Sequence, residues 1–170
     1  MKPQEDEMFC PNEETCLKLL ETYGTPPHVI AHCKAVARVA DRMGAALLAK
    51  GISLDLPRIH AAALLHDIAR VEKDHEHVGA AYLRQAGCDP RISDMIAVHM
   101  DLPEEESHKI TEATVVFLAD KLVAEDEEVS IQQRYARQKA KADDALRAII
   151  EKKYEKAKRV YQMVQDALES

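Results

Sequence analysis

Hydrophobic residues recur along the chain at the three- and four-residue spacing of amphipathic helices, and no clear alternating pattern of strands is visible. Proline, glycine and capping residues divide this pattern into segments of helical length. The predicted helices cover residues 12–23, 27–50, 56–69, 75–85, 90–99, 110–124, 130–141 and 143–170. A loop rich in Glu and Pro, residues 101–107, separates two of them. The pattern therefore predicts an all-α fold, a bundle of about seven to eight helices.

The ends of several predicted helices carry residues that start or stop a helix. Asn12 and Asp55 stand where a side-chain oxygen can accept a backbone N–H of the first turn. Gly51 and Gly87 follow predicted C-termini. Because the chain has no long linker and no internal repeat, we expect one domain over residues 1–170.

The last predicted helix, residues 143–170, is strongly amphipathic. Its apolar stripe comprises Leu146, Ile149, Ile150, Tyr154, Ala157, Val160, Tyr161, Val164 and Leu168. Residues 101–128 are acidic, whereas residues 134–159 are basic. Two solvated helix faces would explain this asymmetry. The alternatives are a basic wall that guides an anionic substrate and a contact between opposite charges in a homodimer.

The charge balance argues against one class of partner. Lys and Arg total 23 and Asp and Glu total 30, so the formal net charge is −7. Generic binding to nucleic acid is therefore not expected, since it needs a surplus of basic residues. The longest purely apolar run, residues 61–65, is far shorter than the roughly 18 residues that cross a bilayer, and we expect no membrane span.

Nothing in the sequence indicates export from the cytoplasm. Residues 1–7 are acidic and have no apolar core, so no secretory signal is predicted. The four cysteines, Cys10, Cys16, Cys33 and Cys88, are scattered and form no C-x-x-C pair. We expect a cytoplasmic protein with free thiols, in which Cys33 lies in a helix core.

Four predicted helices place a His or Asp on or beside the face that their pattern assigns to the core. These residues are His32, His66 with the adjacent Asp67, His99 and Asp120. A single His on such a face is usually a core residue that a backbone carbonyl satisfies. A buried carboxylate is harder to explain, because it costs several kcal/mol unless it is paired or bound to a metal. No Lys or Arg lies on these stripes in an obvious partnering position.

The simplest interpretation is that these His and Asp side chains lie close together in the folded protein. Two or more imidazoles and two carboxylates form a divalent-cation site that suits Fe, Mn, Co, Ni or Zn better than Ca. Neighbours on a helix point about 100° apart, so His66 and Asp67 can share one ion only if it lies off the side of the helix. His32 and Asp120 come from other helices and have the side chains needed to complete the ligand shell.

At this point the residues resemble the HD superfamily of metal-dependent phosphohydrolases. The motif is a helix His (His32), an adjacent His-Asp pair (His66 and Asp67) and a distant Asp (Asp120). Their contexts are His-Cys-Lys-Ala-Val, Ala-Leu-Leu-His-Asp-Ile-Ala-Arg and Phe-Leu-Ala-Asp-Lys. The motif core covers about residues 25–125, so the resemblance implies an HD-domain helical bundle on which the helices of residues 130–170 pack.

Two further histidines resemble those of two-metal members of the superfamily. His75 opens His-Glu-His-Val-Gly-Ala, which is similar to their His-x-x-x-Gly-Ala element, and His99 resembles the second. In layout the chain is similar to bacterial HD hydrolases that split dinucleoside tetraphosphates symmetrically. It is also similar to HD modules associated with molybdenum-cofactor-type nucleotidyltransferases.

The resemblance implies roles for individual residues. One metal would be held by His32, His66, Asp67 and Asp120, and a second by His75 and His99 with Asp67 as the bridge. His77 competes with His75 as a ligand, because both lie in one short segment.

Nearby charged groups are candidates for contact with a substrate. The predicted catalytic residues are Asp67, Lys121 and Arg70, and the predicted substrate-binding residues are His28, His77, Arg84 and Lys121. An ion pair with a helix neighbour is the alternative role for Lys121, and a surface position near a helix start is the alternative for His28. His60 and His108 are expected to be exposed residues without a role.

Together these residues predict a metal-dependent phosphohydrolase that acts on a nucleotide or another small phosphate ester or anhydride. One or two divalent ions would lower the pKa of a bound water and offset the charge of phosphate oxygens. One alternative is a di-iron oxygenase of the HD type. Another is a module that binds a nucleotide without turnover and regulates a partner.

Overall fold

The computed structural model describes residues 9–170, which form eight α-helices, a short 3-10 helix and a hairpin of two short strands. The elements are α1 (Glu13–Tyr23), α2 (Pro27–Ala49), α3 (Leu56–Leu65), α4 (His75–Gln85), α5 (Pro90–Ala97), η2 (Glu106–His108), α6 (Glu112–Lys121), β1 (Val123–Ala124), β2 (Glu127–Glu128), α7 (Ile131–Ala140) and α8 (Asp144–Glu169). The predicted all-α class is confirmed. Residues 1–7, on which the expected lack of a secretory signal rests, lie outside the described residues.

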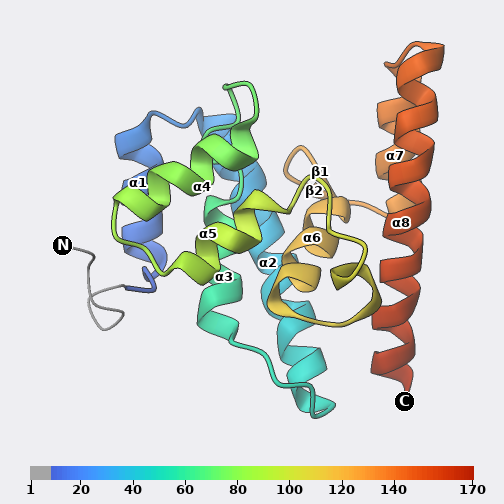
Figure 1. Ribbon diagram of the computed structural model, residues 1–170, viewed down its shortest axis with the longest axis horizontal. Helices are drawn as coiled ribbons and strands as arrows, with labels where there is room; N and C mark the ends of the chain where they lie inside the picture. The colour runs from blue at the N-terminus through green and yellow to red at the C-terminus, as the bar shows by residue number, and fades with distance from the viewer. Residues whose placement is uncertain (1–8) are drawn as a thin grey trace.

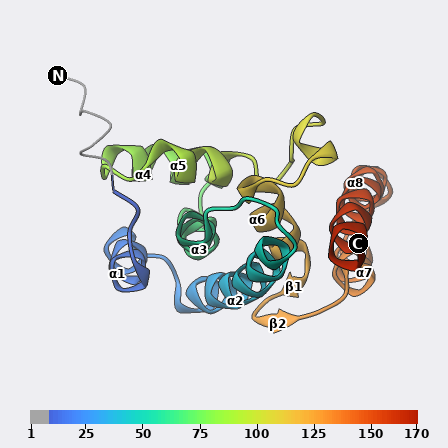
Figure 2. The ribbon, with the colours of Figure 1, turned by 90° about the horizontal axis from the view of Figure 1, so that it is seen from below.

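Helices α2, α3 and α6 pack against one another and form the centre of the bundle. Helices α4 and α5 form a layer on one side of this centre, and α1 packs against α3 (Figure 2). Helices α7 and α8 pair at the opposite edge (Figure 1). Residues 61–65 of α3 are all buried, as expected for a helix that is enclosed by others. Within residues 9–170, no helix has the length and hydropathy needed to cross a membrane.

Helices α3 and α5 end earlier than their sequences suggested, and both ends matter for the site. Helix α3 stops at Leu65 instead of continuing to residue 69. Short i to i+3 bonds follow, from the Ile68 N–H to the Leu65 carbonyl and from the Arg70 N–H to the Asp67 carbonyl. The buried Thr25 hydroxyl donates a hydrogen bond of 2.8 Å to the Ile68 carbonyl and ties this turn to the start of α2. Helix α5 similarly ends at Ala97.

The segment after α6 contains a small hairpin where the sequence predicted continuing helix. Helix α6 begins at Glu112, after its cap Thr111, and ends at Lys121, so the prediction of helix over residues 110–124 was too long. Strands β1 and β2 pair antiparallel around a turn in which Glu125 adopts a left-handed φ of 58°. The sequence shows no alternating pattern here because strands of two residues are too short to produce one.

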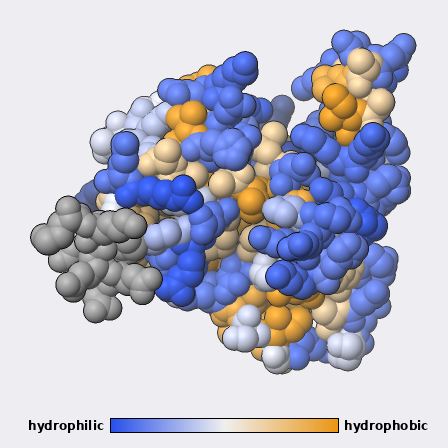
Figure 3. Space-filling model, in the orientation of Figure 1, coloured by the Kyte–Doolittle hydropathy of each residue, from blue (hydrophilic) through white to orange (hydrophobic). Residues whose placement is uncertain are grey.

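The apolar stripe of α8 is only partly covered. Ile150, Ala157, Val160 and Val164 are buried, whereas Leu146 and Ile149 are exposed. The reason is that the first turns of α8 extend with α7 beyond the rest of the molecule, where Figure 3 shows an apolar patch.

Opposite charges from the acidic and basic segments meet within this chain. The Lys156 ammonium lies 2.9 Å from an Asp101 carboxylate oxygen, and the Arg159 guanidinium lies 3.2 Å from Glu104. Some of the basic residues of α8 are thus paired with the loop before η2. These contacts account for part of the charge asymmetry without a partner chain.

The carboxylate of Asp89 connects α3 to α5. It caps α5 by accepting a 2.9 Å hydrogen bond from the Arg91 N–H, and it accepts a 2.7 Å hydrogen bond from the Arg58 guanidinium of α3. Burial raises the pKa of Asp89, but these hydrogen bonds outweigh burial and hold the pKa below its usual value. The ionised carboxylate therefore stabilises the folded state.

We predict that Asp89→Ala lowers the free energy of unfolding by about 1–3 kcal/mol, because it removes a cap and leaves Arg58 without its partner. The depressed pKa means that the contribution of Asp89 is present above about pH 4 and is lost as the pH falls further. Urea unfolding at pH 7 and pH 3 measures both effects. Asp94→Ala, at an exposed ion pair with Arg84, serves as the control with a small effect at both pH values. An equal loss in the two variants at pH 7 would contradict the prediction.

Candidate metal centre

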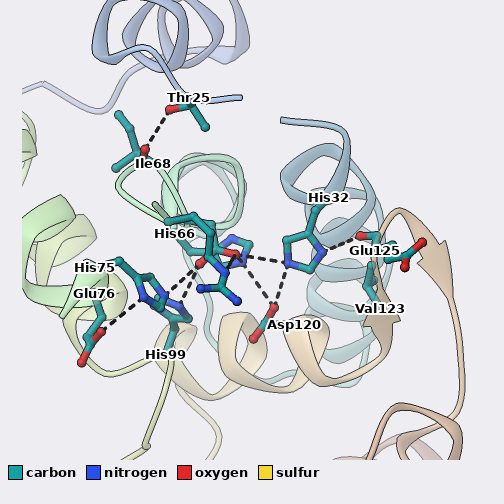
Figure 4. Close-up of polar contacts among 12 residues, drawn as sticks. Thr25, His32, His66, Ile68, His75, Glu76, His99, Asp120, Val123 and Glu125 are labelled. Carbon is teal, nitrogen blue, oxygen red and sulfur yellow. Dashed lines mark hydrogen bonds and ion pairs between the residues drawn. The ribbon is translucent and has the colours of Figure 1, made fainter. Parts of the chain in front are cut away.

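The carboxylate of Asp67 lies at the centre of four imidazoles, with each oxygen facing a different pair. Figure 4 shows the rings of His32, His66, His75 and His99 gathered in one cluster with Asp120. Its Oδ2 is 3.5 Å from Nε2 of His32 and 3.5 Å from Nε2 of His66. Its Oδ1 is 3.2 Å from Nε2 of His75 and 3.3 Å from Nε2 of His99. These atoms form two groups with the spacing of metal ligands, and Asp67 belongs to both.

Backbone carbonyls orient three of the four imidazoles. Nδ1 of His66 lies 2.7 Å from the Ala63 carbonyl, and Nδ1 of His99 lies 2.7 Å from the Ile96 carbonyl. Nδ1 of His32 lies 2.6 Å from the carbonyl of Glu125 in the hairpin turn. A carbonyl oxygen can only accept, so each Nδ1 must carry the proton. In the neutral ring this leaves a lone pair on Nε2, the atom that faces Asp67.

Three buried Nε2 atoms of this cluster lack hydrogen-bond partners. Nε2 of His66, of His75 and of His99 is buried and makes no hydrogen bond. Burial lowers the pKa of His66, yet the charge of Asp67 and its other neighbours outweigh burial and raise it well above its usual value. The site therefore has a negative potential at Nε2 of His66. Unpartnered nitrogen donors, two carboxylates and a negative potential are the features that a divalent cation requires, so the residues fit a metal.

Asp120 lies beside the first of the two groups and is compensated by two buried or half-buried cations. Its Oδ1 lies 3.1 Å from Nε2 of His32 and 3.3 Å from Nε2 of His66. Its Oδ2 lies 2.8 Å from the Lys121 ammonium and 3.6 Å from the Arg134 guanidinium. Burial raises the pKa of Asp120, but these two cations outweigh burial and hold the pKa well below its usual value. Asp120 is therefore a carboxylate in the folded protein.

A cavity of about 790 Å³ opens beside the cluster. Its walls come from the start of α2, the turn after α3, the β1–β2 turn and α7. Of the predicted metal ligands, His32, Asp67, His75, His99 and Asp120 line it. His66 does not, since its side chain is fully enclosed behind Asp67.

The predicted substrate-contacting residues fall into two groups. Arg70 and His28 line the cavity, and the Arg70 guanidinium lies 3.9 Å from Oδ2 of Asp67. His77 is exposed beside Glu76, and Arg84 is paired with Asp94 at 2.5 Å. Neither His77 nor Arg84 is among the described residues that line the cavity.

Lys121 lies beneath the site rather than in the cavity wall. Its ammonium donates hydrogen bonds to Oδ2 of Asp120 and, over 3.1 Å, to the His99 carbonyl. The Lys121 ammonium thereby contacts one candidate ligand residue beside each group, Asp120 and His99. This geometry corresponds to the ion pair that the sequence offered as the alternative role of Lys121.

The remaining histidines lie outside the cluster. His108 is exposed and lies 3.1 Å from Glu104, in line with the expected exposed position. His60 is half-buried and not exposed, because its ring packs beside Asp41 with Nδ1 2.8 Å from a carboxylate oxygen.

Sequence reasoning missed three groups that shape the site. Arg134 reaches from α7 and donates hydrogen bonds to the carbonyls of Asp120 and Val123. Glu125 acts through its main chain, and Thr25 acts on the turn after Asp67. Of these three, only Arg134 could have been suspected from the sequence, because it lies in the basic segment 134–159.

The chain matches the HD domain family over residues 29–125, and it belongs to that family. This confirms the membership that His32, His66, Asp67 and Asp120 predicted. The similarity to particular two-metal subgroups stays a prediction. HD domains bind divalent metals, and the two groups around Asp67 are consistent with that property.

Several curated proteins are similar to the chain. A tRNA (cytidine(56)-2'-O)-methyltransferase of Thermoplasma volcanium is 33% identical over 139 residues, which are 72% of this chain and 40% of that protein. An uncharacterised protein of Methanocaldococcus jannaschii is 30% identical over 120 residues, 61% of this chain and 71% of that protein. Ribonuclease Y of Pseudothermotoga lettingae is 34% identical over 113 residues, 64% of this chain and 20% of that protein.

The chain thus spans about two fifths of the methyltransferase relative and a smaller share of the ribonuclease. No solved structure matches it significantly.

We predict that the protein binds two divalent ions and that the two groups can be separated by mutation. His99→Ala should lose one ion, because only one group contains His99, whereas Asp67→Ala should lose both. Mass spectrometry under native conditions, after titration with Mn²⁺, Fe²⁺ or Zn²⁺, counts the ions. His108→Ala, which removes an imidazole outside the cluster, should bind as wild type does. Equal metal content in wild type and Asp67→Ala would contradict the assignment.

We also predict that the Thr25 hydroxyl stabilises the turn that carries Asp67. Thr25→Val removes its hydrogen bond to the Ile68 carbonyl and should cost about 1 kcal/mol of folding free energy. It should also weaken metal binding, since the turn beside Asp67 is less constrained. Thr25→Ser keeps the hydroxyl and should retain the metal affinity. Thermal unfolding and metal titration of both variants test this, and equal affinities would refute it.

Proposed function

We propose that the protein is a metal-dependent hydrolase of phosphate esters or anhydrides, with a nucleotide or another small phosphorylated molecule as its substrate. The observation that carries this proposal is the position of Asp67, whose two oxygens face separate groups of imidazoles. The proposal assigns His32, His66, Asp67 and Asp120 to one ion and Asp67, His75 and His99 to the other.

The donor set favours Fe, Mn, Co, Ni or Zn, because imidazoles and carboxylates are both present and thiolates are not among the ligands. When bound, such ions lower the pKa of a water and neutralise the charge that develops on phosphate oxygens.

The protein's own cations have separate tasks in this proposal. Arg70 lines the cavity with its side chain 57% exposed, so its guanidinium is free to bind a phosphate oxygen beside Asp67. Lys121 is buried and stabilises the ionised form of Asp120. His28 lies on the cavity wall four residues before His32 and is assigned to substrate binding.

The names of the relatives support a substrate that contains nucleotides. One relative is named as a ribonuclease and another as a tRNA methyltransferase, and both names denote RNA as the molecule acted on. The ester and anhydride bonds of nucleotides are phosphoryl bonds, so this is consistent with the chemistry that the site favours.

We predict that Asp67→Asn lowers phosphohydrolase activity by about a thousandfold or more, because it removes charge from both ligand groups at once. A panel of nucleotides, dinucleotides and sugar phosphates, assayed for phosphate release with Mn²⁺ or Fe²⁺, measures the activity. Circular dichroism should show largely unchanged helix content. Asp41→Asn is the matched control, since Asp41 also lies beside an imidazole but outside the cavity.

Other outcomes would point to the alternative functions. Equal rates in wild type and Asp67→Asn would refute the proposal. A mixed-valence iron signal without phosphate release would favour a di-iron oxygenase. Nucleotide binding without turnover would favour a regulatory module.

A further inference from the structure

Helix α7 forms one wall of the cavity with a row of cationic side chains. Arg134, Arg137 and Lys141 all line the cavity, together with Gln138. Their spacing of three, four and seven residues places them on one face of a helix. We call Arg134, Arg137 and Lys141 the α7 cation row. The family match ends at residue 125, so this row lies outside the residues that define the HD domain.

The α7 cation row starts at the candidate metal centre, where Arg134 lies beside Asp120, and then leads away from the centre along the cavity wall. The Arg134 guanidinium lies 3.6 Å from Oδ2 of Asp120 and donates to the Asp120 carbonyl. With a rise of 1.5 Å per residue, Arg137 follows about 4.5 Å further along the axis of α7, and Lys141, the C-cap of α7, lies about one turn beyond Arg137. One wall therefore presents positive charge over a length greater than that of a single phosphate group.

The two outer cations of the row are weakly engaged by the protein. The Arg137 guanidinium forms an exposed ion pair of 3.7 Å with Glu127 that is too long for a hydrogen bond, and Lys141 is exposed. Lys139, on the same helix but not in the cavity wall, behaves differently: it pairs with Glu151 and lies over the Tyr154 ring. Helix packing thus accounts for Lys139 but not for Arg137 and Lys141.

Four carboxylates also line the cavity. Asp67 and Asp120 belong to the proposed metal groups, where bound cations would offset them. Glu125 and Asp126 form the β1–β2 turn and also line the cavity, and the Glu125 carbonyl lies beside Nδ1 of His32. The Arg and Lys side chains among the lining residues are Arg70 and the α7 cation row.

We propose that Arg137 and Lys141 form a subsite for a second phosphate group of the substrate, distinct from the phosphoryl group that is hydrolysed. The substrate class is then a molecule with two or more phosphates, such as a nucleoside polyphosphate or a short nucleotide chain. A phosphate monoester at the metal centre would leave this subsite empty. The inference rests on the proposed function for the identity of the reacting group, but the binding of a second phosphate can be tested without it.

Calorimetric titration of the metal-free protein with inorganic tripolyphosphate tests the subsite directly. Arg137→Gln/Lys141→Gln should weaken binding about tenfold or more, because two ionic contacts are lost. Arg38→Gln/Lys152→Gln removes the same charge from exposed positions outside the cavity and should bind as wild type does. Equal weakening in the two variants, unchanged binding in the first, or no binding by wild type would overturn the proposal.

Kinetics of the metal-loaded protein then identify the source of the second phosphate. Arg137→Gln/Lys141→Gln should raise KM for adenosine triphosphate, for a trinucleotide, or for both, while kcat/KM for p-nitrophenyl phosphate stays unchanged. An effect on adenosine triphosphate alone indicates a nucleoside polyphosphate, and an effect on the trinucleotide alone indicates a nucleotide chain. Equal losses for the monoester would overturn the subsite. If no substrate is turned over even by wild type, the proposed function fails, while the titration still decides the subsite.

Discussion

The carboxylates of Asp67 and Asp120 are almost completely enclosed by protein, and the surrounding structure has to offset the cost of burying them. An unpaired buried carboxylate costs several kcal/mol, so each needs positive charge or hydrogen-bond donors nearby. For Asp120, Lys121 and Arg134 provide that charge. For Asp67 the neighbours are mainly imidazoles, and Nε2 of three of them makes no hydrogen bond. The centre of the fold is thus arranged around a charge that a bound cation would balance.

Helix ends, more than helix faces, position the ligand candidates. Because α3 stops at Leu65, His66 and Asp67 lie in tight turns, and the His66 ring can reach the Ala63 carbonyl in the last turn of α3. Because α5 stops at Ala97, His99 can reach the carbonyl of Ile96 in the same way. The last carbonyls of a helix lack intrahelical donors. Each early helix end therefore supplies both the position of an imidazole and the acceptor that orients it.

Helical periodicity was sufficient to predict most of the helices and the polar positions that should converge, because His32 and Asp120 interrupt otherwise apolar stripes. It could not predict contacts made through the main chain. The Glu125 carbonyl orients His32 from a hairpin whose strands have two residues each, and a carbonyl is present at every residue type. The search for cations on the apolar stripes missed Arg134, since its helix follows the motif core and its side chain crosses from α7 to α6.

The basic residues that follow the acidic segment have two different environments in the fold. The basic residues of α8 meet acidic residues of the preceding loop, as Lys156 does with Asp101, so that part of the charge is neutralised within the chain. Arg137 and Lys141, by contrast, line the cavity together with Arg134. A protein with a formal net charge of −7 repels anions at long range. An anionic ligand would therefore be attracted only locally, within the roughly 8 Å over which charges act at physiological salt, and Arg134, Arg137 and Lys141 place positive charge in the cavity wall at that range.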